Sequence, residues 1–182
     1  MDKRLIIDHK HLEITLHRLA FQLFETHKDF RNTALIGLQP RGVEFARNIH
    51  KIVCELSGNN DIHFGALDST FYRDDFRRND KPLIPNAMQL NFSIDNLNIV
   101  LLDDVLYTGR SVRSALNALN DYGRPDHTEL MVLIDRKYNR ELPIQPDYTG
   151  EAVDTRAKDR VKVELAEEDK KVWIITEQNE NE

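Results

Sequence analysis

Two consecutive carboxylates, Asp103 and Asp104, follow Leu97–Leu102, which is the most strand-like segment of the chain. Two apolar residues come next, and Tyr107–Ser111 (Tyr-Thr-Gly-Arg-Ser) then opens an amphipathic stretch. The pattern predicts a buried strand that ends at the two acids, followed by a short turn and the start of a helix. The N-terminus of a helix has free backbone N–H groups and a partial positive charge, so it suits a phosphate group.

The residue types in this segment predict a site for a sugar phosphate. Thr108 and Ser111 can add hydroxyl donors to the phosphate, and Gly109 lets the backbone come close to it. The two carboxylates would repel a phosphate, so they are better suited to accept hydrogen bonds from neighbouring sugar hydroxyls. A phosphate site at one end and acceptors for a diol at the other describe a ribose 5-phosphate. Two alternatives stay open: a capped helix without a ligand, and a magnesium site of the response-regulator or phosphatase type.

Strands and helices alternate along the chain, which predicts a parallel sheet covered by helices on both faces. A first helix begins after Asp8, with leucines at intervals of four, three and four residues. Strands are expected at Thr33–Leu38, Ile62–Leu67, Leu97–Leu102 and Leu130–Ile134, further helices at 43–56 and 110–122, an irregular segment from Asp135 to Arg160, and a hairpin of Val161–Leu165 with Val172–Thr176. One domain would span residues 1–176, and residues 177–182 would form a polar tail.

The composition is that of an ordinary soluble domain, because 40% of the residues are hydrophobic and 31% are charged. The longest apolar run is too short to span a bilayer, and the first residues lack the apolar stretch of a signal peptide. Cys54 is the only cysteine, so no internal disulfide can form. We therefore expect a cytoplasmic protein without a membrane partner. The net charge of −6 argues against a protein that mainly binds nucleic acid, although it allows a local basic face.

The segment Val100–Ser111 resembles the phosphoribosyl-pyrophosphate signature of type I phosphoribosyltransferases. Within this segment, the residues Asp-Asp-Val-Leu-Tyr-Thr-Gly-Arg are similar to those found in the family of bifunctional pyrimidine-operon regulators and uracil phosphoribosyltransferases. Further stretches resemble that family's pyrophosphate loop (Gly37–Gly42), the strand before its flexible lid (Leu67–Asp75) and its base hood (within 123–144). The resemblance implies a single-domain α/β fold of the type I phosphoribosyltransferases: a mainly parallel, twisted sheet with helices on both faces, a small hood and a β-hairpin lid.

The resemblance also implies a role for each matching residue. Asp103 and Asp104 would hold the ribose hydroxyls of phosphoribosyl pyrophosphate (PRPP). The segment that binds its 5-phosphate would be Val105, Leu106, Tyr107, Thr108, Gly109, Arg110 and Ser111. Pyrophosphate would be neutralised by Arg73 of the lid (Phe71–Lys81) and by Arg41 of the loop Gln39, Pro40, Arg41 and Gly42. The base hood would comprise Ile134, Asp135 and Arg136. Mg²⁺ would enter with PRPP and be held mainly by the substrate, without a direct protein site.

We therefore predict a uracil phosphoribosyltransferase that makes uridine monophosphate (UMP) and pyrophosphate, as a dimer or higher homo-oligomer. Tyr107 favours a pyrimidine base, because purine phosphoribosyltransferases usually carry an acid at this position. A purine or orotate phosphoribosyltransferase stays open as an alternative.

A second alternative is an RNA-binding regulator that senses UMP in the same pocket. The family's RNA face is matched only in part. Arg18 is kept, while Phe21, Gln145 and Glu151 stand where the family has histidine, arginine and lysine. The segment after Arg136 is also one residue longer than in the family.

Overall fold

The computed structural model describes residues 2–69, 90–156, 158–165 and 169–176. Its elements in chain order are β1 (Asp2–Ile7), α1 (His9–His27), β2 (Thr33–Leu38), α2 (Gly42–Ser57), β3 (His63–Leu67), β4 (Asn98–Leu106), α3 (Arg110–Tyr122), β5 (His127–Lys137), β6 (Tyr148–Asp154), β7 (Asp159–Glu164) and β8 (Lys171–Thr176). The predicted lid (Phe71–Lys81), which includes Arg73, lies outside the described residues. The predicted C-terminal tail lies outside them too.

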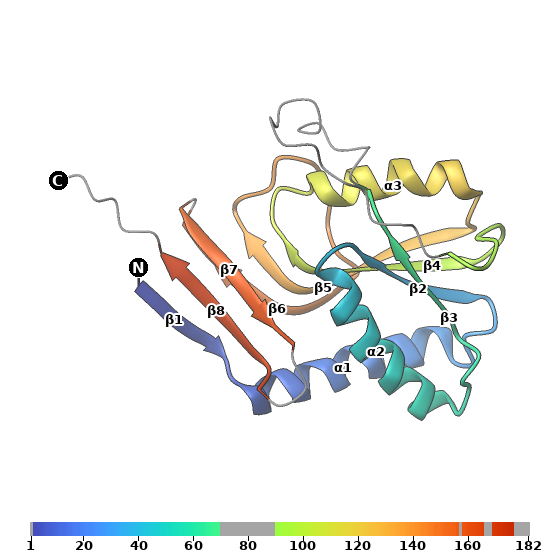
Figure 1. Ribbon diagram of the computed structural model, residues 1–182, viewed down its shortest axis with the longest axis horizontal. Helices are drawn as coiled ribbons and strands as arrows, with labels where there is room; N and C mark the ends of the chain where they lie inside the picture. Colours follow the sequence, from blue (N-terminus) through green and yellow to red (C-terminus); the bar gives the residue numbers. More distant parts are fainter. Residues whose placement is uncertain (1, 70–89, 157, 166–168, 177–182) are drawn as a thin grey trace.

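Five parallel strands form the central sheet in the order β3-β2-β4-β5-β6, which confirms the predicted α/β class. Figure 1 shows α3 on one face of this sheet and α1 and α2 on the other. Side chains alternate along a strand, so neighbouring residues enter different cores. Leu35 and Val100 pack toward α1 and α2, whereas Ile36 and Leu101 pack toward α3. β4 lies in the middle of the sheet and therefore delivers its carboxyl end to the centre of the molecule.

The helices begin and end where local chemistry favours it. The Asp8 carboxylate accepts a hydrogen bond from the backbone N–H of His11 at 2.8 Å and caps α1. Gly58 takes a left-handed conformation (φ 66°) directly after α2. The predicted leucine stripe of α1 is fully buried and consists of Leu12, Leu16, Leu19 and Leu23. Within the described ranges, none of the helices has the length and apolar character needed for a membrane crossing.

A second, smaller sheet has the order β1-β8-β7 and lies beside the main one in Figure 1. Its β7 and β8 pair antiparallel, which confirms the predicted hairpin. The N-terminal strand β1 was not predicted. It pairs antiparallel with β8, with Asp2 opposite Thr176 and Leu5 opposite Trp173. The first and last strands of the described chain thus pair in one sheet.

The predicted ends of two strands are wrong, and a second strand besides β1 was missed. β4 runs through the two acids as far as Leu106, because β5 extends to Lys137 and offers a partner along the whole length. β6 lies within the segment that was expected to be irregular. Its glycine and charged residues lower its strand propensity, but parallel pairing with β5 and packing against α1 support it.

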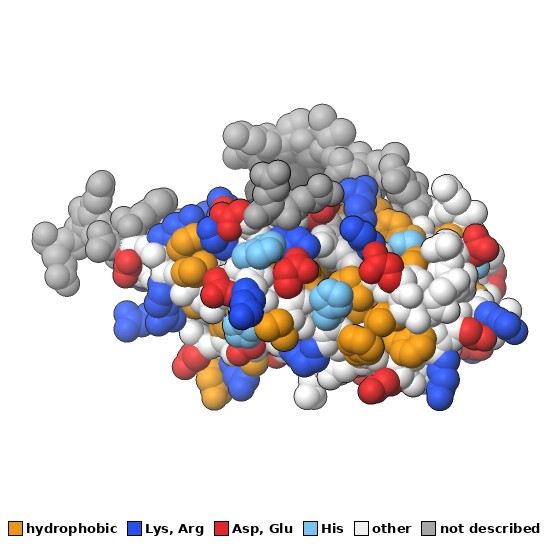
Figure 2. Space-filling model, turned by 90° about the horizontal axis from the view of Figure 1, so that it is seen from below, with side chains coloured by type: hydrophobic (Ala, Val, Ile, Leu, Met, Phe, Trp, Pro, Cys, Tyr) orange, Lys and Arg blue, Asp and Glu red, His pale blue; other side chains and the backbone are white. Residues whose placement is uncertain are grey.

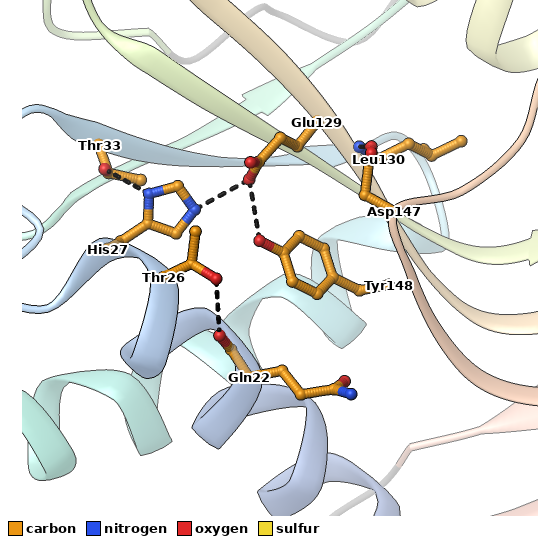
Figure 3. A network of polar contacts seen from close by, with 8 residues as sticks. All are labelled: Gln22, Thr26, His27, Thr33, Glu129, Leu130, Asp147 and Tyr148. Carbon is orange, nitrogen blue, oxygen red and sulfur yellow. Dashed lines mark hydrogen bonds and ion pairs between the residues drawn. The ribbon is translucent and has the colours of Figure 1, made fainter.

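A buried polar cluster ties the end of α1 to the sheet (Figure 3). The side chain of His27 is 5% exposed; its Nε2 lies 2.9 Å from Oε2 of Glu129, and its Nδ1 lies 3.1 Å from Oγ1 of Thr33. The Tyr148 hydroxyl donates to the same Glu129 oxygen at 3.2 Å. Carboxylate, imidazole and hydroxyl follow in the order of a hydrolase triad. Thr33 is only 2% exposed, however, so no substrate can reach its hydroxyl and the cluster is structural.

Candidate active site

A cleft of about 1050 Å³ lies between the carboxyl end of β4 and the edge strand β7 of the small sheet. Segments from different parts of the chain meet there: the loop before α2, the end of β4, the start of α3, the end of β5 and β7. The predicted site residues that line the cleft are Gln39, Pro40, Arg41, Asp103, Asp104, Val105, Tyr107, Ser111 and Arg136.

Other predicted site residues lie elsewhere. The side chain of Leu106 is buried in the core beneath α3, and that of Ile134 is buried in the core beneath α1 and α2. Asp135 forms an ion pair with Arg140 instead of facing the cleft. Of the predicted hood residues, the structure therefore brings only Arg136 into the cleft. Strand alternation turns Asp135 to the other face, whereas Ile134 shares the face of Arg136 but is enclosed in the core.

Gly42 allows the loop Gln39–Gly42, the predicted pyrophosphate loop, to lie directly against the acid pair. A Cβ added at Gly42 would lie 2.5 Å from the carbonyl oxygen of Leu102 and 3.2 Å from Oδ1 of Asp103. Such distances exclude any larger side chain without movement of the backbone. The turn before α2 also contains a cis peptide bond between Gln39 and Pro40. Glycine at the first position of α2 therefore sets how close Arg41 comes to the carboxylates.

Burial dominates the electrostatics of the acid pair. The Asp103 carboxylate accepts a hydrogen bond from the backbone N–H of Asp104 at 3.0 Å. Burial, and next the charge of Asp104, raise the pKa of Asp103 well above its usual range. Burial also raises the pKa of Asp104, and the charge of Arg41 offsets part of that rise. The pair is therefore costly to ionise in the free protein, and hydrogen-bond donors or cations brought by a ligand would stabilise it.

The turn between β4 and α3 is braced from outside by the residues after β5. Gly109 has φ of 90° directly before α3, whose first turn contains no acid that would compete with a bound phosphate. The carbonyl oxygen of Thr108 accepts hydrogen bonds from the backbone N–H groups of Glu141 and Leu142 at 3.0 and 3.2 Å. Arg110 and Glu141 form an ion pair at 2.6 Å.

Arg140, which lies in the same segment after β5, also stabilises the turn between β4 and α3. Its guanidinium donates to the carbonyl oxygen of Tyr107 and to the carboxylate of Asp135. Ile144 lies over Gly109, where an added Cβ would come within 3.2 Å of its Cδ1. The stretch that is one residue longer than the family pattern thus supports the turn between β4 and α3.

Arg136 and Tyr107 form a stacked pair in the cleft. The guanidinium carbon of Arg136 lies 3.8 Å from the centre of the Tyr107 ring, which is a cation–π contact. Nε of Arg136 donates to Oγ1 of Thr155 at 2.8 Å, and Nη2 donates to the carbonyl oxygen of Arg156 at 3.2 Å. Burial lowers the pKa of Arg136. These contacts hold the guanidinium in one orientation and create a flat, positively charged surface.

Several cleft residues on β7 and just before it were not predicted. Lys158, Arg160 and Lys162 line the cleft, together with Asp159. Asp159 accepts hydrogen bonds from the backbone N–H of Arg156 and from the Thr176 hydroxyl, both at 2.8 Å, and these bonds lower its pKa. A signal for the basic residues exists in the sequence, since they recur at every second position, as side chains on one face of a strand do. The sequence alone did not indicate that β7 lines the same cleft as Asp103 and Asp104.

The carboxylates of the described chain do not form a full metal site. No group of three or more His, Cys, Asp or Glu side chains that could hold an ion occurs in the described ranges. Asp103 and Asp104 are adjacent oxygen donors, which suit Mg²⁺ only when other ligands complete the shell.

Comparison with known proteins agrees with the fold. The phosphoribosyl transferase domain family matches residues 5–168. The hypoxanthine phosphoribosyltransferase of Trypanosoma cruzi superposes with a TM-score of 0.66 at 13% identity, over 86% of this chain and 84% of that chain. A hypoxanthine phosphoribosyltransferase of Staphylococcus aureus gives 0.64 at 17% identity, over 84% and 79%. The family match and the fold identify a type I phosphoribosyltransferase.

The relatives found by sequence similarity place the chain in a narrower family than the domain match does. The protein named Bifunctional protein PyrR of Picosynechococcus sp. is 44% identical over 164 residues, which are 90% of this chain and 91% of the relative. The protein of the same name from Desulfosudis oleivorans is 41% identical over 170 residues, 93% of each. The chain belongs to the PyrR family.

Proposed function

We propose that the chain transfers the ribose 5-phosphate of PRPP to uracil, which yields UMP and pyrophosphate. The bond between the anomeric carbon and pyrophosphate breaks, a bond to N1 of uracil forms, and the N1 proton is released. The observation that carries the proposal is that Asp103, Asp104, the N-terminus of α3 and a row of cations share one cleft. PRPP presents a vicinal diol, a monophosphate and a pyrophosphate, and each has a matching group there.

The cations of the cleft suit a leaving pyrophosphate. Arg41 comes from the loop before α2, and Arg160 and Lys162 come from β7 at another side of the cleft. As the bond to pyrophosphate breaks, negative charge grows on the leaving group and positive charge on the sugar ring. Fixed cations stabilise the first, and the buried carboxylates that hold the diol favour the second. Catalysis would then rest on positioning and electrostatics, with no covalent intermediate.

Mg²⁺ would accompany PRPP. Oxygens of the substrate would supply most of its ligands, because the described carboxylates do not form a metal site by themselves. The ion would neutralise part of the pyrophosphate charge when bound. The task of Asp103 and Asp104 remains the orientation of the ribose hydroxyls.

The proposed base is uracil because of the residues at the hood end of the cleft. Arg136 stacks on Tyr107, and Lys158 lies on the same cleft. Their charges suit the two carbonyl oxygens of uracil. Tyr107 supplies no carboxylate that would favour the imidazole side of a purine. The two hypoxanthine enzymes compared above are 13% and 17% identical to this chain, so their base is not carried over.

A panel of bases tests the proposal. The chain would be mixed with PRPP, Mg²⁺ and uracil, orotate, hypoxanthine or guanine, and pyrophosphate release would be measured. Uracil should give by far the highest kcat/KM, a reaction without base should report hydrolysis only, and Asp104→Asn should lower the release with every base. A higher kcat/KM for a purine or for orotate would contradict the proposed substrate.

The name of the relatives, Bifunctional protein PyrR, favours one second candidate: an RNA-binding regulator that responds to UMP in the same cleft. Arg18, the residue kept from the family's RNA face, donates to the carbonyl oxygens of Thr149, at 3.3 Å, and Gly150. A gel-shift assay with pyrimidine-operon leader RNA, with and without UMP, tests this role. Binding that UMP strengthens and salt weakens steeply supports it; binding indifferent to UMP and to sequence contradicts it.

A further inference from the structure

Ser69 lines the cleft, although no role was predicted for it from the sequence. It stands two residues after β3 and borders the cleft together with Gln39, Pro40 and Arg41. Only 7% of the residue is exposed. A small polar side chain is thus nearly enclosed beside the loop that carries Arg41.

The hydroxyl of Ser69 differs from the other buried hydroxyls of the described chain. The others each have a hydrogen-bond partner in the protein: Thr15, Thr33, Ser114 and Thr155. Ser69 has none among the described residues. It is also not among the residues of these ranges whose unbonded polar atoms are sealed from solvent, so its oxygen reaches the open space of the cleft. A nearly buried hydroxyl without a partner is costly and uncommon in folded proteins, which indicates a ligand.

The order of the strands places Ser69 at the opposite end of the cleft from Arg136. β5 carries Arg136, β4 carries the acid pair, β2 leads to Arg41 and β3 leads to Ser69; these strands are parallel and lie in the order β3-β2-β4-β5. Neighbouring strands are about 4.8 Å apart, so Ser69 lies about 10 Å from the acid pair. The backbone N–H of Gln39 donates to the carbonyl oxygen of Leu67 at 3.0 Å, which joins the end of β3 to the loop of Arg41.

We propose that the Ser69 hydroxyl donates a hydrogen bond to the terminal phosphate of pyrophosphate, both in PRPP and in the released product. The assignment rests on the proposed function, in which the acid pair holds the ribose and the base lies near Arg136. Pyrophosphate then extends from the ribose past Arg41 toward the end of β3, where its terminal phosphate meets Ser69. The contact exists before and after the bond to the sugar breaks, so it should affect binding more than turnover.

The charges around Ser69 suit the same ligand. Arg41, Arg160 and Lys162 line the cleft that Ser69 enters. Figure 2 views the molecule from the side of α1 and α2, where basic, acidic, apolar and histidine side chains are interspersed. Two adjacent phosphates are bound best where several cations and a hydroxyl donor converge, as they do in the cleft. Free pyrophosphate is therefore a suitable probe for Ser69.

Calorimetric titration of the full chain with magnesium pyrophosphate tests the assignment. Ser69→Ala should weaken pyrophosphate binding about tenfold or more, because a hydrogen bond to a charged group is lost. Its affinity for ribose 5-phosphate should be unchanged, since that compound has the diol and the 5-phosphate but no pyrophosphate. Wild-type affinity of the variant for pyrophosphate, or a loss of affinity for ribose 5-phosphate instead, would overturn the proposal.

Thermal unfolding separates a ligand contact from a structural role. Ser69→Ala should leave the Tm of the free protein unchanged or raise it, because the hydroxyl has no partner to lose. Ser57→Ala is the matched control: the Ser57 hydroxyl donates to the carbonyl oxygen of Val53 at 2.7 Å at the end of α2, away from the cleft. This control should lower Tm and bind pyrophosphate like the wild type. A lower Tm of free Ser69→Ala would make Ser69 structural and contradict the proposal.

Steady-state kinetics separate a failure of this assignment from a failure of the proposed function. With uracil as the base, Ser69→Ala should raise KM for PRPP about tenfold and change kcat and KM for uracil little. If the wild type transfers ribose 5-phosphate to no base, the proposed function is wrong, and the titration with pyrophosphate still decides the role of Ser69. If the wild type uses uracil and Ser69→Ala keeps the same KM for PRPP, only the assignment of Ser69 is wrong.

Discussion

Replacing Asp104 with asparagine should make the free protein more stable and the enzyme slower. Asp104 is buried at the end of β4, and burial raises the pKa of its carboxyl although the charge of Arg41 offsets part of that rise. Asparagine has nearly the same shape and needs no ionisation. The substitution therefore removes a charge that the fold holds at a cost and that the proposed reaction uses.

The sign of the stability change follows from proton binding. A raised pKa means that the folded state binds the proton more tightly than the unfolded state, so stability falls as the pH rises above the unfolded-state pKa of about 3.9. Once the pH passes the folded-state pKa, the full penalty is present. Asp104→Asn lacks this penalty, so its Tm should exceed that of the wild type at neutral pH, by about 2–4 °C for each kcal/mol relieved. Near pH 4 the difference should shrink.

Activity should change in the opposite direction to stability, so Asp104→Asn should be slower than the wild type. One charge-assisted hydrogen bond to a ribose hydroxyl is worth about 1.5–3 kcal/mol, so kcat/KM for PRPP should fall about ten- to a hundredfold. Pyrophosphate release at saturating uracil measures kcat/KM, and calorimetry at neutral and acid pH measures Tm. Near-normal activity in the folded variant would show that the acids have another task. A lower Tm at neutral pH would refute the argument that the buried carboxylate destabilises the free protein.

Three further substitutions test the loop, the packing and the anchor of α1. Arg41→Ala should raise KM for PRPP about tenfold or more and leave KM for uracil nearly unchanged, because it removes a charged contact to pyrophosphate; equal shifts would make Arg41 structural. Gly42→Ala should lower Tm and activity together, because its Cβ would lie 2.5 Å from the Leu102 carbonyl oxygen; a variant that melts and turns over like the wild type would contradict that close packing. Glu129→Gln should lower the free energy of unfolding by about 1–3 kcal/mol in urea titration, because His27 loses a charged partner. Unchanged kcat and KM are expected for Glu129→Gln, and altered kinetics would connect the His27 cluster to the cleft.

The sequence of residues within short segments predicts the strand, turn and helix that carry much of the proposed site. Asp103 and Asp104 at the end of an apolar segment, followed by Tyr107–Ser111, predict a strand, a turn and a helix without any knowledge of distant residues. The leucine spacing of α1 likewise predicts its buried stripe, and Asp8 its start. These features depend on neighbours within a few residues, where helix and strand periodicity and capping act.

Features that depend on distant partners were decided only by the tertiary structure. β6 is a strand because β5 lies beside it, and β1 because β8 does. Ile134 and Arg136 are two residues apart on one strand, yet one is enclosed in the core and the other reaches the cleft. Strand spacing alone would put both on the same face, so only the packing around the end of β5 separates them. Lys158 and its neighbours became part of the cleft because the small sheet brings β7 to the end of β4, a contact between residues more than fifty positions apart in the chain.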